Sequence, residues 1–338
     1  MQTVLTIVVP CYKEEEVLNK TNRTLIDLLN EMINAEQIAS NSRILYVDDG
    51  SDDQTWAVIQ QFSTDFNSVT GLKLSRNFGH QGALLAGLEV AVKKSDCIVT
   101  IDADLQDDPT VIREFIKAFN NGYEVVYGVR KKRETDTFFK KHTALFFYKS
   151  MNWLGVELVA NHADFRLLSK QAAKQLLDFK ETTMFIRGIV PLLGFSSTKV
   201  YYDRKKREAG ESKYPLKKMI SFSIEGLTSF SIAPIKFILA LGMVSLVVAT
   251  IITIYALSRK VLGETVSGWT SMMISLWILG GLQLISISII GLYIGKIFME
   301  VKHRPRFIIE QENFSDSFNQ IKEKNIKQFS AQKQKFFH

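Results

Sequence analysis

The stretch RILYVDDGSDDQT, from Arg43 to Thr55, decides the fold. A short apolar run followed by an Asp- and Gly-rich turn predicts a buried strand that ends at a polar edge. Asp48 and Asp49 stand at that end, where adjacent carboxylates repel one another unless cations or hydrogen-bond donors are near. A plain turn and a ligand site both remain open for this pair. Side chains that suit the N-cap of a following helix are those of Ser51, Asp52 and Asp53.

The same strand-then-helix pattern extends over residues 3–128. It predicts strands at 4–9, 43–47, 71–74, 97–102 and 124–128, separated by helices near 15–33, 54–66, 80–93 and 109–120. Such alternation predicts an α/β domain with a mostly parallel sheet and helices on both faces. Ligands of such sheets bind beyond the carboxyl ends of the strands. Further along, we expect helices near 138–155, 169–178 and 183–193 and strands at 163–169 and 197–202.

Acidic residues follow three of the predicted strands, in PCYKEEE (10–16), DDGSDD (48–53) and DADLQDDP (102–109). Together in one crevice they would be strongly destabilising without a counter-ion, and a divalent cation with a nucleotide would resolve the conflict. Alternate residues of an extended segment point the same way, so Asp102 and Asp104 can share one cation. Mg²⁺ and Mn²⁺ suit few carboxylates plus phosphate oxygens.

The neighbouring loops supply groups that suit a nucleotide. Asp48 and Asp49 could accept hydrogen bonds from a uracil imide or from ribose, and Glu14 from ribose. Arg76, in RNFGHQGALLAG, could hold the base or the pyrophosphate, and the helix that follows offers its N-terminus to phosphate. His80 could either cap this helix or contact the ligand, and the sequence leaves both roles open.

Apolar residues are concentrated near the end of the chain of 338 residues, whose mean hydropathy is +0.03. Residues 235–257 and 272–294 are each long enough to cross a bilayer, which takes about 20 residues. Basic residues flank the pair on its outer sides, so the positive-inside rule predicts a two-span hairpin with the large N-terminal part and both termini in the cytoplasm. We divide the chain into an α/β domain (1–214), an amphipathic juxtamembrane helix (215–233), two spans (234–296) and a cytoplasmic tail (297–338).

The remaining composition narrows the class of protein. MQTVLTIVVP lacks a basic leader, and its apolar run is too short for a signal peptide. Two cysteines without metal-type spacing suit a reducing compartment. A net charge of +7 suits phosphate ligands and anionic lipids, whereas two spans argue against nucleic acid. Small residues in the second span would allow a homo-oligomer with close helix packing.

Five motifs together resemble the inverting family 2 glycosyltransferases of the GT-A fold: VVPCYKEEE, VDDGSDDQT, RNFGHQGALLAGL, DADLQDDP and REAGESKY. The closer resemblance is to the polyprenyl-phosphate glycosyltransferase branch, which includes bactoprenol glucosyltransferases and the relatives of dolichol-phosphate mannose synthase. It covers roughly residues 3–310. The motifs are specific for the family and much less so for the sugar.

The resemblance also implies site residues, motif by motif. The nucleotide-sugar would contact Pro10, Tyr12, Glu14, Asp49, Asp102 and Gln106, to which the residue chemistry above adds Asp48 and Arg76. The metal, Mg²⁺ or Mn²⁺, would lie among Asp102, Asp104 and Gln106. The acceptor phosphate would meet Arg130, Arg133, Arg207, Ser212 and Lys213. Catalytic roles fall to Asp104, Asp164, Arg130 and Arg207, with Asp164 at the position of a general base.

The predicted reaction is inverting transfer of a hexose from a UDP-sugar, UDP-glucose first, to undecaprenyl phosphate at the cytoplasmic membrane face. UDP-N-acetylglucosamine or another UDP-sugar is an alternative donor, and a diacylglycerol-type lipid an alternative acceptor. A lipid phosphate is already anionic and needs no base, so Asp164 could orient a sugar hydroxyl or Arg166 instead. A processive synthase is disfavoured because the chain lacks a Q-x-x-R-W motif, and a non-catalytic scaffold because the D-x-D triplet is intact.

Overall fold

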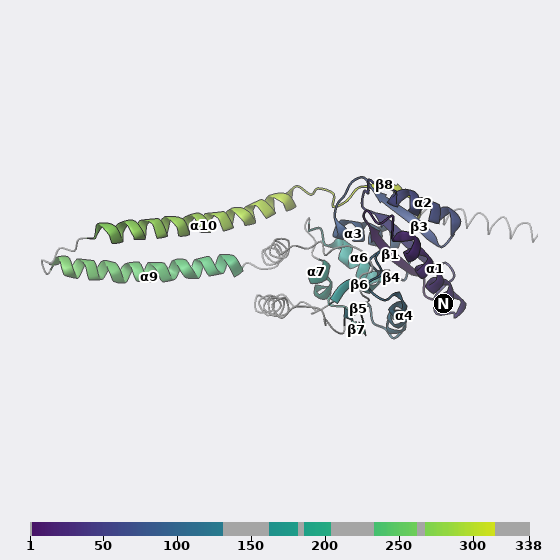
Figure 1. Ribbon diagram of the computed structural model, residues 1–338. Coiled ribbons are helices and arrows are strands. Elements are labelled where there is room, and N and C mark those ends of the chain that lie inside the picture. Colours follow the sequence, from purple (N-terminus) through teal and green to yellow (C-terminus); the bar gives the residue numbers. More distant parts are fainter. Residues whose placement is uncertain (1, 131–161, 182–185, 204–232, 262–267, 315–338) are drawn as a thin grey trace, which may run out of the picture. The chain divides into compact units, whose positions relative to one another are not determined.

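The computed structural model describes residues 2–130, 162–181, 186–203, 233–261 and 268–314 (Figure 1). The chain divides into two compact units. We call the first, residues 1–148, 157–211 and 305–338, the α/β unit, and the second, residues 149–156 and 212–304, the helical unit.

The α/β unit is built on one sheet, which has eight strands in the part of the chain that the structure describes. They are β1 (Leu5–Cys11), β2 (Arg43–Asp48), β3 (Val69–Leu74), β4 (Cys97–Thr100), β5 (Val125–Arg130), β6 (His162–Ser169), β7 (Ser197–Tyr202) and β8 (Ile309–Glu312), in the spatial order β7-β5-β6-β4-β1-β2-β3-β8. Neighbours in the run β4-β1-β2-β3 are parallel, as are β5 and β7. β6 is antiparallel to both β4 and β5. The predicted α/β fold with a mostly parallel sheet is therefore confirmed.

Helices cover both faces of the sheet (Figure 1). On one face α1 (Leu18–Asn34), α2 (Thr55–Asp65) and α4 (Ile112–Asn120), with the short 3-10 helix η1 (Pro109–Val111) before α4, share a core with alternate strand residues such as Leu5, Ile7 and Val9. On the other face α3 (His80–Ala91) approaches β1 so closely that a Cβ on Gly87 would lie 2.4 Å from Val8 Cγ1. Burial of these strands on both faces explains their continuous apolar runs.

Two further helices lie in the second half of the unit, α6 (Lys170–Asp178) and α7 (Ile186–Leu192). Together with the first four helices they match the predicted elements, with ends that shift by a few residues. The helix predicted near 138–155 lies outside the described residues.

The C-terminal segment differs from the prediction. We expected residues 297–338 to form a tail, yet Ile309–Glu312 is the edge strand β8, antiparallel to β3. Phe314 is buried, and Lys94 Nζ lies 5.5 Å from the centre of its ring. The tail assignment was wrong for this stretch, because a four-residue strand with only one apolar residue, Ile309, gives almost no periodic signal.

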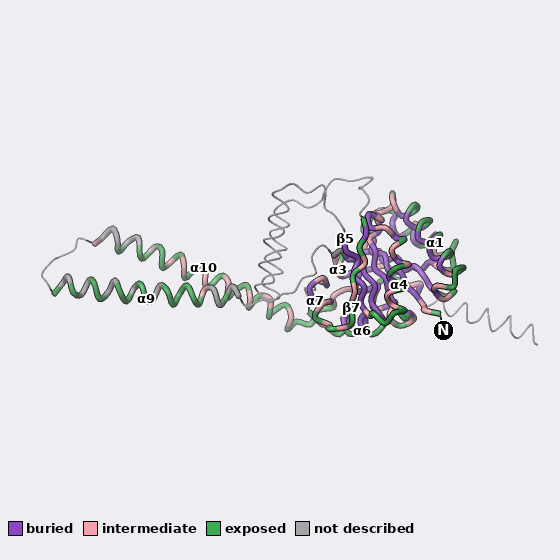
Figure 2. Tube along the Cα trace, turned by 90° about the horizontal axis from the view of Figure 1, so that it is seen from below, coloured by how far each residue is buried: buried purple, intermediate pink, exposed green. Residues whose placement is uncertain are grey.

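The helical unit contains two long helices, α9 (Ala233–Val261) and α10 (Trp269–Val301), which contain the two predicted spans. Figure 2 shows their described residues as exposed or intermediate, in contrast to the buried strands of the sheet. Among the described residues, one helical segment, Ile278–Val301, is long and apolar enough to cross a membrane. The two-span hairpin stays a prediction, and most of the predicted juxtamembrane helix (residues 215–232) lies outside the described residues.

Candidate active site

The loops after β1 and β2 are fastened to one another at the carboxyl-terminal edge of the sheet. The backbone N–H of Lys13 donates to Ser51 Oγ (3.0 Å), and that of Glu14 donates to Thr55 Oγ1 (3.0 Å). Lys13 Nζ also lies 2.7 Å from a carboxylate oxygen of Asp52. Hydroxyls of the DDGSDDQT stretch therefore position the PCYKEEE loop.

The Asp48-Asp49 pair is buried within this edge. The carboxylate of Asp49 accepts from the backbone N–H groups of Phe78 (2.7 Å) and Gly79 (2.9 Å), so it holds the loop after β3. Asp48 Oδ1 accepts from the N–H of Ser51 at 3.2 Å, and its Oδ2 has no partner among the described residues. Burial raises the pKa of both carboxyl groups, although the hydrogen bonds act against the rise. At least Asp49 therefore has a structural task, whatever it does with a ligand.

Gly50 allows the loops after β2 and β3 to touch. It has φ +65°, and a Cβ there would lie 2.3 Å from the carbonyl carbon of Arg76. Arg76 itself is exposed, with its guanidinium 4.0 Å from the centre of the Phe78 ring. Only glycine fits this contact.

The other predicted nucleoside contacts differ in accessibility. Tyr12 is 42% exposed, whereas Pro10 is buried within β1. The structure therefore brings the loops that carry Tyr12, Glu14 and Arg76 to one edge of the sheet. Their contacts with a nucleoside stay predictions.

The D-x-D segment follows β4 at the same edge. The side chain of Asp102 is 42% exposed, and Leu105 adopts a left-handed φ of +44°. Asp104 Oδ1 accepts from the N–H of Gln106 (3.2 Å), whose buried side-chain nitrogen finds no acceptor in the described parts of the chain. Partial burial, together with the charges of Asp164, Asp107 and Asp104, raises the pKa of Asp102, and His80 opposes the rise.

These groups fit a hard divalent cation that is completed by a ligand. Asp102 and Asp104 offer carboxylate oxygens, the donors that Mg²⁺ and Mn²⁺ prefer. No three His, Cys, Asp or Glu side chains converge on a metal-sized site within the described residues. A cation here would therefore take its remaining ligands from phosphate or water.

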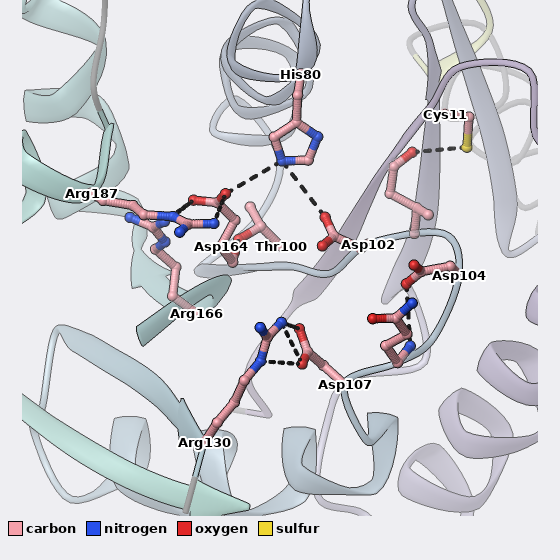
Figure 3. Close-up of polar contacts among 12 residues, drawn as sticks. Cys11, His80, Thr100, Asp102, Asp104, Asp107, Arg130, Asp164, Arg166 and Arg187 are labelled. Carbon is pink, nitrogen blue, oxygen red and sulfur yellow. Dashed lines mark hydrogen bonds and ion pairs between the residues drawn. The ribbon is translucent and has the colours of Figure 1, made fainter. Parts of the chain in front are cut away.

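His80, at the start of α3, points between two carboxylates (Figure 3). Its Nε2 lies 3.6 Å from Asp102 Oδ1 and 3.5 Å from Asp164 Oδ2. Burial alone would lower the pKa of His80, but the two carboxylates raise it above its ordinary value. His80 thus belongs to the site and is more than a cap.

Asp164, on β6, is paired with two guanidinium groups (Figure 3). Arg187 of α7 donates through Nε (3.2 Å) and Nη2 (2.7 Å), and Arg166 donates through Nη2. Thr100 donates its hydroxyl to the backbone carbonyl of Asp164. Burial would raise the pKa of Asp164, but Arg187, His80 and Arg166 together hold it well below the ordinary range. A carboxylate stabilised to this extent is a poor proton acceptor.

Arg130, at the end of β5, forms a bidentate pair with Asp107. Its Nε and Nη2 lie 3.0 and 3.1 Å from the two oxygens of this buried carboxylate. The charge that we assigned to a phosphate is therefore shared with Asp107. The other predicted phosphate ligands, Arg133, Arg207, Ser212 and Lys213, lie outside the described residues.

Sequence reasoning missed two members of the site, Asp107 and Arg187. Asp107 lies in DADLQDDP, where it could not be told apart from Asp108, which instead caps η1 through a bond from the N–H of Thr110 (3.1 Å). Arg187 is the only charge in MFIRGIVPLLG, residues 184–194. A single charged residue in an otherwise apolar helix was the feature that could have identified Arg187 as a site residue.

Comparison with known proteins identifies the class. Residues 6–177 match the model of Glycosyl transferase family 2, and the chain belongs to this family. It is therefore a glycosyltransferase with the GT-A fold, as the motifs predicted. The chain is 52% identical over 97% of its length to the uncharacterized glycosyltransferase YkoT of Bacillus subtilis, with 99% of that protein covered.

More distant relatives carry a more specific description. The bactoprenol glucosyl transferase of Shigella phage SfV is 35% identical over 91% of this chain and 98% of that protein. The prophage bactoprenol glucosyl transferase homolog of Escherichia coli is 34% identical over 91% of this chain and 98% of that protein. Each of these matches includes the regions of α9 and α10 as well as the sheet.

Proposed function

We propose that this glycosyltransferase transfers a hexose from a UDP-sugar, UDP-glucose first, to a polyprenyl phosphate at the cytoplasmic face of a membrane, with inversion at the anomeric carbon. The observation that carries the proposal is the arrangement of the Asp102 and Asp104 carboxylates beside the His80, Asp164 and Arg187 cluster at one edge of the sheet. The likeness to bactoprenol glucosyl transferases over nine-tenths of the chain supports the lipid acceptor.

The donor would bind at the acidic end of this arrangement. Asp102 and Asp104, with Gln106 beside them, would hold Mg²⁺ or Mn²⁺ against the UDP diphosphate. A cation held there would neutralise charge that develops on the departing diphosphate. Tyr12 and Glu14, on the loop fastened by Ser51 and Thr55, would contact the nucleoside.

The chemistry requires no general base. A phosphate oxygen of the acceptor forms the new bond to the anomeric carbon, while the bond from that carbon to the diphosphate oxygen breaks and its electron pair leaves with UDP. The attacking oxygen is already anionic, so no proton is transferred. What the site must supply is orientation and charge neutralisation. The pairing of Asp164 with two guanidinium groups agrees with a reaction that leaves this carboxylate ionised throughout.

The main alternative acceptor is less well matched. A diacylglycerol hydroxyl would have to lose its proton to a base near the sugar. Asp164, the residue that the resemblance places there, is held ionised by its partners and has a pKa well below the ordinary range. The same geometry therefore favours an acceptor that is already an anion.

The test is transfer from radiolabelled UDP-sugars to undecaprenyl phosphate or diacylglycerol by purified full-length protein, with Mg²⁺, Mn²⁺ or EDTA. We expect metal-dependent label in undecaprenyl phosphate from one donor, with UDP-glucose tested beside UDP-N-acetylglucosamine and UDP-galactose. Label in diacylglycerol alone would refute the proposed acceptor. Label that survives EDTA would refute the metal.

A further inference from the structure

Two arginines hold Asp164, and they differ in accessibility. Arg166 is buried, with 1% of its surface exposed, whereas the side chain of Arg187 is 42% exposed. Arg187 comes from α7 and lies on the side of Asp164 away from Asp102 (Figure 3). We propose that Arg187 binds the phosphate of the lipid acceptor, and that Asp164 is a positioning residue that fixes its guanidinium. This inference rests on the proposed function.

The charge and the exposure of Arg187 agree with an anionic ligand. Of the two arginines that hold Asp164, Arg187 has a side chain that is 42% exposed, whereas that of Arg166 is 2% exposed. The side chain of Arg130, paired with Asp107, is 22% exposed. A phosphate could therefore approach the Arg187 guanidinium, whose planar donor fork suits phosphate oxygens.

The position of Arg187 also suits the direction of the reaction. In an inverting displacement the attacking oxygen and the leaving oxygen lie on opposite sides of the anomeric carbon. The Asp102-Asp104 carboxylates mark the leaving side, because a cation bound there would hold the diphosphate. Asp164 and His80 stand between Asp102 and Arg187, so Arg187 lies on the attacking side (Figure 3).

The bidentate contact between Asp164 and Arg187 gives Asp164 a role in the site that does not require it to act as a base. Two bonds, of 3.2 and 2.7 Å, fix the plane of the Arg187 guanidinium. The carboxylate is fixed in turn, because Thr100 holds its backbone carbonyl and Arg166 its side chain. Orientation of the acceptor would thus pass from the rigid sheet through Asp164 to Arg187.

The test measures how the transfer rate saturates with undecaprenyl phosphate and, separately, with the labelled donor. The variants are Arg187→Gln, Arg187→Lys and Asp164→Asn. Arg113→Gln serves as the matched control, since it removes an arginine from an exposed pair with Glu31. We expect Arg187→Gln to raise the KM for undecaprenyl phosphate about tenfold or more, while the KM for the donor stays within about twofold. The KM of Arg187→Lys for undecaprenyl phosphate should lie between those of the wild type and Arg187→Gln, because lysine keeps the charge and loses the planar fork.

A double-mutant cycle separates positioning from proton transfer. If Asp164 acts through Arg187, then Asp164→Asn combined with Arg187→Gln should be no slower than the slower single variant. A general base would give losses that multiply. Melting temperatures show whether each variant is folded at the assay temperature, and the two Arg187 variants decide the matter if Asp164→Asn is not.

The outcomes also distinguish this inference from the proposed function. A wild-type protein that labels no polyprenyl phosphate overturns both. An active wild-type protein whose Arg187→Gln variant matches Arg113→Gln overturns the inference alone. An equal rise of both KM values in Arg187→Gln overturns it too, because the residue would then serve the site as a whole.

Discussion

The tips of β2 and β4 are both rich in aspartate and lie at the same edge of the sheet, yet the structure uses them differently. At the β2 tip, Asp49 is buried, and its carboxylate is occupied by two backbone N–H groups. At the β4 tip, the Asp102 side chain is 42% exposed and faces His80 across 3.6 Å. Acidic clusters at one edge of a sheet can therefore differ in use: one fastens loops together, and the other leaves a carboxylate exposed where we propose that the donor binds.

Among the variants that test this contrast, Asp104→Ala should have the largest effect on the transfer rate. Loss of a carboxylate from the proposed metal site should lower kcat about a hundredfold to a thousandfold. The melting temperature in EDTA should stay close to that of the wild type, because Asp104 is only partly buried. Radiolabel transfer and thermal unfolding measure the two quantities, with Asp52→Ala as the control at the β2 tip. A large fall in melting temperature would make Asp104 a structural residue like Asp49.

Asp164→Asn should cost stability, because it removes the charge opposite buried Arg166. Breaking a buried pair by removing one partner costs about 3 kcal/mol. Since the pKa of Asp164 is held below its unfolded value, its stabilising effect is fully present above the unfolded pKa, near 4, and is lost as the pH falls through the folded pKa. Urea unfolding should therefore show a deficit for the variant that grows from pH 8 towards pH 5, because Asp164 also raises the pKa of His80, and that shrinks below pH 4. A deficit that persists unchanged at pH 3 would contradict the assigned charge state.

Asp49→Ala tests the other side of the comparison. The variant leaves two N–H groups, those of Phe78 and Gly79, without their acceptor, at a cost of about 2 kcal/mol in the free energy of unfolding. Hydrogen exchange should become faster at these two amides in particular. Unchanged stability together with a raised KM for the donor would show that Asp49 contacts the nucleoside and has no structural role.

The smallest effect is expected for Asp52→Asn. Its partner Lys13 is exposed, as is Asp52 itself, and surface ion pairs contribute about 0–1 kcal/mol. Neither the urea midpoint nor the transfer rate should change measurably. A clear loss of transfer would show that the acidic residues of the β2 tip reach the ligand after all.

The sequence predicted the parallel sheet and the edge at which the acidic tips meet, because apolar periodicity reports burial directly. It could not predict that Asp49 would bind the N–H groups of Phe78 and Gly79, since contacts of this kind depend on the exact path of two loops. Arg187 was missed for a related reason, as it meets Asp164 only through the packing of α7 beside β6. The D-x-D triplet, found from spacing, and Asp164, singled out by the family resemblance, both lie beside His80, and their roles stay predictions.

Because β8 comes late in the sequence, the sheet cannot be completed until the end of synthesis. β3 has been made by Leu74, but its outer partner is Ile309–Glu312, about 240 residues later. At roughly 5–20 residues per second, a ribosome needs on the order of 10–50 s to cover that distance. Both long helices emerge in the interval, while the β3 edge presents unpaired N–H and C=O groups to any passing strand. During this interval the nascent chain is exposed to wrong strand pairing at β3, which β8 prevents in the finished protein. In a chain that stops after α10, the β3 edge would stay unpaired.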